Sequence, residues 1–101
     1  MIKHIVMWKL KDFAEEANKA VNAQKIKELL ESLKDKIKEI KHIEGGINII
    51  NSDAAADVAL YSEFECMEDL NIYQKHPWHQ KIVQFIRNTC AERRVVDYEV
   101  L

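Results

Sequence analysis

The chain has few of the residues that mark specialised folds: among 101 residues there are two glycines, one proline and two cysteines. Cys66 and Cys90 are too few for a disulfide framework and lack the spacing of metal ligands, so we expect free thiols in a reducing cytoplasm. Gly45 and Gly46 do not make a glycine loop that cradles phosphate. No serine stands in a nucleophile elbow, and neither cysteine has a histidine near it in sequence.

Long apolar runs and an excess of one charge are also missing. No segment approaches the length of a membrane span, and the chain goes straight into Ile2-Lys3-His4-Ile5 without a secretory leader, so we expect a cytoplasmic protein. The formal net charge of −2 gives no attraction to nucleic acid or anionic membranes. The remaining composition, 48% hydrophobic and 32% charged, is typical of a helix-rich globular protein, and we expect one domain over residues 1–101.

The spacing of the apolar residues predicts an α+β fold. Alternating apolar residues predict strands, and apolar residues at i, i+3, i+4 and i+7 predict helices. Gly45-Gly46 is expected to end a long helical region with a flexible turn. The order is strand, helix, strand, strand, helices, strand, which is a ferredoxin-like βαββαβ arrangement with a four-stranded antiparallel sheet. The predicted strands are 2–10, 47–50, 58–65 and 94–101, and the predicted helices are about 15–41, 67–75 and one that Pro77 opens.

One face of this sheet is predicted to be apolar and left uncovered by the helices. Such a patch is too large to leave in water. A second copy of the same sheet covers it, because a two-fold interface brings the same patch from both subunits. The sequence therefore predicts a homodimer whose sheets pack face to face into a dimeric α/β barrel. The residues expected on this face are Ile5, Met7, Ala59, Tyr61, Val96, Tyr98 and Val100.

The segment from Tyr73 to His79 concentrates rare residue types at a helix-to-helix junction. Tyr73 and His79 can face a pocket between the helices and the sheet. His4 and Asp97 are polar residues on strand faces where apolar residues are expected. If these four side chains converge, the aspartate can fix the tautomer of one imidazole, whose other nitrogen can exchange a proton with a substrate. A nearby phenol can stabilise a developing oxyanion.

The same residues also have a structural interpretation, and the spacing leaves both open. A buried His–Asp pair can simply satisfy its own hydrogen bonds, and His76 can hold the turn before Pro77. We expect no cofactor. A metal site on His76 and His79 is not predicted either, because the pair straddles a proline and has no obvious third ligand.

Four segments together resemble the stress-responsive A/B barrel (Dabb) family along nearly the whole chain. The motif Tyr73-x-x-His76-Pro77-x-His79 is the most specific of them. The resemblance implies a dimeric ferredoxin-like barrel, and many members of the family are known only as small stress-associated proteins without an assigned reaction. The other three segments are 2–10, 59–65 and 95–99.

One plant branch of that family, similar to olivetolic acid cyclase, closes a linear polyketide by an intramolecular aldol condensation. The resemblance implies His79 as acid/base, Tyr73 as its assistant and Asp97 as the partner of His79. It also implies that His4 lies in the pocket. The chain has no bulky aromatics on the long helix, so the same substrate is not expected. The expected pocket residues are His4, Val6, Trp8, Phe64 and His76, with Ala17, Ala20 and Val21 contributed by the long helix.

Two functions therefore remain open from the sequence. The first is a stress-response protein that binds a small hydrophobic molecule between helices and sheet. The second is a cyclase or lyase that uses His79 as acid/base.

Overall fold

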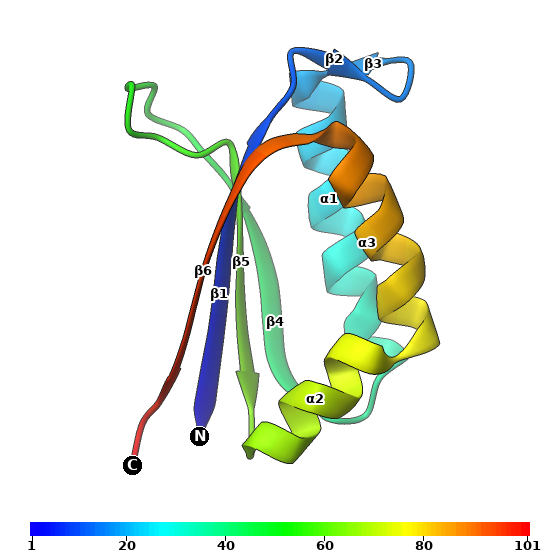
Figure 1. Ribbon diagram of the computed structural model, residues 1–101, viewed down its shortest axis with the longest axis vertical. Helices are drawn as coiled ribbons and strands as arrows, with labels where there is room; N and C mark the ends of the chain where they lie inside the picture. Colours follow the sequence, from blue (N-terminus) through cyan, green and yellow to red (C-terminus); the bar gives the residue numbers. More distant parts are fainter.

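A four-stranded antiparallel sheet forms one layer of the molecule and the helices form the other (Figure 1). The structure is a computed structural model that describes residues 1–101. The strand order is β4-β5-β1-β6, so the first and last strands lie side by side. This is the predicted α+β ferredoxin-like fold. The main elements are β1 (Ile2–Leu10), α1 (Lys19–Ser32), β4 (Ile40–Ile47), β5 (Val58–Phe64), α2 (Met67–Lys75), α3 (Pro77–Thr89) and β6 (Cys90–Glu99).

The core lies between the helical layer and one face of the sheet. Alternate residues of β1 and β5 are buried, which follows from the two-residue period of a strand. Helices α1 and α3 run side by side over this face, and α2 lies across one end of it (Figure 1). Burying each large apolar side chain stabilises the fold by roughly 1.5–3 kcal/mol. Phe64, Ile26 and Leu33 are among the fully buried members of an 18-residue cluster.

The long helix predicted over about 15–41 is shorter at both ends. It begins at Lys19, because the Asn18 side chain accepts a hydrogen bond from the Val21 amide (2.9 Å) and caps the first turn. The residues before it form a small hairpin, β2 (Phe13–Ala14) and β3 (Ala17–Asn18), whose turn residues Glu15 and Glu16 have φ of 51° and 59°.

At its other end α1 gives way to a 3-10 turn, η1 (Leu33–Asp35), and then to strand β4. Leu33, Ile37 and Ile40 are all buried, as the helical period predicts, but by a turn and a strand. Their spacing is compatible with a continuous helix and also with a turn followed by a strand. For this reason the predicted helix was too long.

The predicted turn at Gly45-Gly46 and the predicted strand at 47–50 are also wrong. Both glycines lie inside β4, paired with Leu60 and Ala59 of β5, and the strand ends at Ile47. A Cβ on Gly45 would come within 3.0 Å of the Lys27 Cα, so the glycine lets α1 approach the sheet closely. β4 and β5 pair antiparallel, as the predicted four-stranded antiparallel sheet requires.

The junction between α2 and α3 is built as the sequence predicts. His76 is extended (φ −65°, ψ 137°), and its Nδ1 accepts a hydrogen bond from the Trp78 amide (3.2 Å). Pro77 follows as the first residue of α3. The closing strand is longer than predicted, since it begins at Cys90 directly after α3.

The other face of the sheet carries no helix (Figure 1). Its apolar side chains are substantially exposed in the single chain, Met7 at 44%, Val96 at 50% and Tyr98 at 45%. Lys3 and Tyr61 both bond the Glu63 carboxylate on this face, each at 2.5 Å. None of the helices has the length and apolar character needed to cross a membrane.

Candidate functional site

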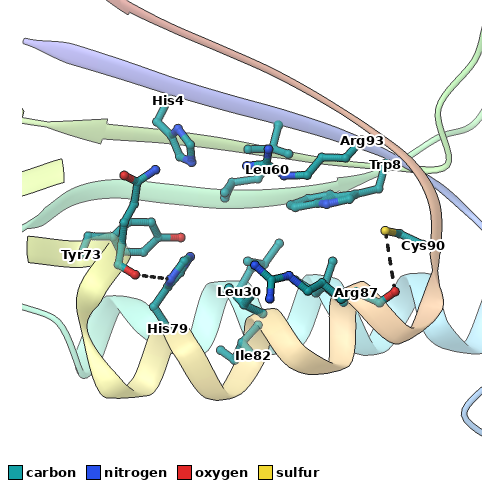
Figure 2. Close-up of a pocket in the computed structure, with 14 residues that line it drawn as sticks. His4, Trp8, Leu30, Leu60, Tyr73, His79, Ile82, Arg87, Cys90 and Arg93 are labelled. Atoms are coloured by element: carbon teal, nitrogen blue, oxygen red, sulfur yellow. Dashed lines mark hydrogen bonds between the residues drawn. The ribbon is translucent and has the colours of Figure 1, made fainter. Parts of the chain in front are cut away.

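A cavity of about 260 Å³ lies between α3 and the helix-covered face of the sheet (Figure 2). Its volume is just below the range of roughly 300–1,000 Å³ typical of pockets for drug-sized ligands, which suits a small metabolite. Arg87 and Arg93 line it and are exposed, so the cavity opens to solvent beside them. The lining comprises His4, Val6, Trp8, Leu60 and Arg93 from the sheet, Cys90 at its edge, and Leu30, Tyr73, Gln74, His79, Ile82, Val83, Ile86 and Arg87 from the helices.

Tyr73 is fully buried and lines the cavity. Its ring packs against Phe64 and His79, with ring centroids 4.9 and 4.5 Å away. Its hydroxyl group has no hydrogen-bond partner in the structure. Burial holds the pKa of Tyr73 above its usual range, so the phenol stays neutral and able to donate. An unpartnered buried hydroxyl is rare, because leaving it unbonded costs about 1–3 kcal/mol.

His79 projects from the first turn of α3 toward the sheet (Figure 2). Its Nδ1 lies 3.0 Å from the Gln74 carbonyl oxygen. A carbonyl can only accept, so Nδ1 carries the proton and Nε2 of the neutral ring is left as an acceptor. Burial is the main cause that lowers the pKa of His79, and the bond to the Gln74 carbonyl opposes it. The nearby His4, Arg93 and His76 add smaller contributions that lower this pKa. The imidazole is therefore neutral at pH 7 and can accept a proton.

Asp97 does not pair with His79, contrary to the prediction. Its carboxylate bonds Nδ1 of His4, because the β1–β6 register places these two residues directly opposite each other. His79 comes from the opposite wall and is oriented by the Gln74 carbonyl instead. Asp97 does not line the cavity, whereas His4 does.

The remaining predicted pocket residues divide into two groups. Val6 and Trp8 line the cavity. Phe64 lies behind the Tyr73 ring, and His76 is occupied in capping α3, so neither reaches the cavity. The part of α1 that reaches it is Leu30, near the end of the helix. The small residues expected to form the helical wall, Ala17, Ala20 and Val21, lie near its start and do not line the cavity.

Arg87 and Arg93 were missed by the sequence reasoning, although both follow from simple periods. Arg93 pairs with Trp8 across β1 and β6, so it shares the face of Trp8. Arg87 follows His79 and Val83 at four-residue intervals on one face of α3. No group of three or more His, Cys, Asp or Glu side chains in the structure is arranged to hold a metal ion.

Comparisons with solved structures show the same fold in other proteins. A dimeric protein of unknown function from Bacteroides fragilis is 38% identical, with a TM-score of 0.86 over 98% of this chain and 95% of that one. A dimeric ferredoxin-like protein of unknown function from Thermobifida fusca is 20% identical, with a TM-score of 0.82 over 98% and 90%. The hydroxynitrile lyase of Passiflora edulis is 16% identical, with a TM-score of 0.81 over 99% and 93%.

The similarity to the Thermobifida fusca and Passiflora edulis proteins shows the fold alone, because their sequence identity is low. A search among curated proteins finds no match to this chain. The model of the Stress responsive A/B Barrel Domain matches residues 2–100. The chain therefore belongs to the stress-responsive A/B barrel (Dabb) family.

Proposed function

We propose that this chain forms a homodimer and binds a small hydrophobic molecule in the cavity beside Tyr73. The unpartnered Tyr73 hydroxyl carries the proposal, because it is buried, neutral and part of the cavity wall. A ligand oxygen bonded to it removes the cost of leaving it unsatisfied. The apolar walls supply the affinity, and Tyr73 and His79 fix the orientation of the ligand.

The homodimer is supported by two independent observations. The uncovered face of the sheet exposes apolar side chains, and a second copy buries the same face from both subunits. The similar proteins from Bacteroides fragilis and Thermobifida fusca are dimeric.

An NMR fragment screen tests the binding proposal. Hits are expected to shift the resonances of Tyr73, His79 and Ile82. Val83→Trp fills the cavity from α3 and is expected to abolish the hits. Val21→Trp is the matched control, since Val21 is exposed on α1 and does not line this cavity. Hits that survive Val83→Trp, or a screen without hits in the cavity, would overturn the proposal.

A second candidate function is a cyclase or lyase reaction in the same cavity. It is favoured by the pairing of an acceptor, the free Nε2 of His79, with a donor, the Tyr73 hydroxyl. His79 takes a proton from carbon or oxygen of the substrate, and the phenol donates to the oxyanion that forms. The Passiflora edulis protein of the same fold is a hydroxynitrile lyase, which shows that such a scaffold can serve lyase chemistry.

His79→Ala separates the two candidates once a ligand is known. The catalytic proposal expects this variant to keep its fold and its ligand but to lose turnover. If the variant unfolds, or turns over at the wild-type rate, His79 is structural and the binding proposal alone remains.

A further inference from the structure

Two arginines line the same cavity from opposite walls without any partner in the chain. Arg87 comes from α3 and Arg93 from β6, and both extend into the space between helix and sheet (Figure 2). Neither guanidinium makes an ion pair, whereas the neighbouring Arg94 lies 3.9 Å from Glu92. Two unpaired cations beside one apolar space are a ready receptor for an anion, because nothing in the chain already neutralises them.

We propose that the molecule bound in this cavity is a small organic acid, held with its carboxylate at the opening between Arg87 and Arg93. This rests on the proposed binding function and names the class of ligand. A guanidinium matches the planar carboxylate with two parallel hydrogen bonds. The apolar body of the acid lies against Val6, Leu60 and Ile82, and its far end meets Tyr73 and His79.

The charges along the cavity give the acid one orientation. No carboxylate lines the cavity, and Asp97 lies four residues beyond Arg93 on β6, which is roughly 13 Å along an extended strand. Asp97 is already bonded to His4, so it neither neutralises Arg93 nor competes for it. Arg93 lies on the sheet wall of the cavity and His79 on the wall formed by α3, so the two arginines stand apart from the polar end formed by Tyr73 and His79. An acid therefore binds with its charged end toward the arginines and its apolar or oxygen-bearing end toward Tyr73.

Matched probes test the inference: 3-phenylpropanoate carries the charge, and 3-phenylpropanamide has nearly the same shape without it. We expect the acid to bind about tenfold more tightly than the amide at low salt, since two partly exposed ion pairs are each worth a few-fold. The preference for the acid over the amide is expected to decrease as the sodium chloride concentration rises from about 20 to about 500 mM, because salt screens exposed charges. This measurement needs only the wild-type protein.

The double variant Arg87→Met and Arg93→Met is expected to bind the amide unchanged and to lose the preference for the acid. Both residues are exposed, so the fold should tolerate their replacement. Lys81→Met is the control, because it removes one positive charge from α3 outside the cavity. It should leave the preference intact.

The outcomes separate this inference from the proposed function. If the amide binds as tightly as the acid, and Val83→Trp abolishes both, the cavity binds ligands but the arginines do not select an acid. If neither probe binds, and the fragment screen also finds nothing in the cavity, both proposals fall. A preference for the acid that survives the double variant places the anion elsewhere and overturns the inference alone.

Discussion

The two faces of the sheet are made from alternate residues of the same strands, yet they are built on different rules. On the helix-covered face the polar groups of His4 and Ser62 are buried and bonded: His4 to Asp97, and the Ser62 hydroxyl to the His4 carbonyl at 2.9 Å. On the uncovered face apolar side chains such as Met7 and Val96 stay exposed in the single chain. Of these two buried polar residues His4 lines the cavity, whereas the apolar residues of the open face point to a partner.

The largest expected effect comes from substituting two adjacent residues of β6 that lie on opposite faces of the sheet. Val95 and Val96 are similarly exposed, 46% and 50%, but Val95 pairs with Val6 on the covered face and Val96 with Ile5 on the open face. Val96→Lys places a charge from each subunit in the proposed interface, which costs several kcal/mol and raises the dimer Kd by about 100-fold or more. Val95→Lys should leave the dimer intact. Sedimentation equilibrium checks both, and a wild-type chain that is monomeric at micromolar concentration would refute the dimer itself.

A smaller effect is expected at Tyr73 on the covered face. Tyr73→Phe removes the unpartnered hydroxyl but keeps the ring that packs on Phe64. The free energy of unfolding of the free protein should therefore stay equal or rise by about 1–2 kcal/mol, while ligand affinity falls. Urea unfolding with and without ligand measures both quantities. A loss of stability in the free protein would mean that the hydroxyl is already bonded.

The smallest expected effect is a pH dependence of the free energy of unfolding that comes from His79. Its pKa is lowered by burial, so below about pH 6.5 the unfolded chain binds a proton that the folded chain does not. Stability is therefore lost as the pH falls from about 6.5 through the folded pKa of His79, and this group adds no dependence above that range. His79→Gln should remove this part of the decrease, as urea midpoints at several pH values would show. Identical pH profiles for the two proteins would exclude the effect.

The fold was largely predictable because alternation is unambiguous where one face of a strand is buried. β1, β5 and the α2–α3 junction at His76-Pro77 follow from the sequence within a residue or so. The prediction was wrong between α1 and β4. Ile37 and Ile40 have the spacing of a buried helix face, but they are buried by a turn and a strand instead. Gly45 was wrongly predicted to lie in a turn. Its role depends on how close Lys27 of α1 comes to the sheet, and a local sequence pattern does not contain that distance.

The candidate site was predictable in part of its membership but not in its pairings. Tyr73, His79 and His4 were recognised as unusual and do line one cavity. The partner of Asp97 depends on the β1–β6 register, which sequence alone does not fix. Arg87 and Arg93 escaped notice because exposed arginines are ordinary in isolation, and only the three-dimensional structure puts both beside one opening.

The position of that opening also bears on how quickly a molecule can come and go. Arg87 and Arg93 are exposed where they line the cavity, so the opening beside them is accessible in this conformation. Binding then needs no prior loop or helix movement, and association should proceed at the rate of oriented diffusion, helped by the two cations. Differences in affinity among ligands should appear mainly as differences in dissociation rate, which stopped-flow measurements can follow directly.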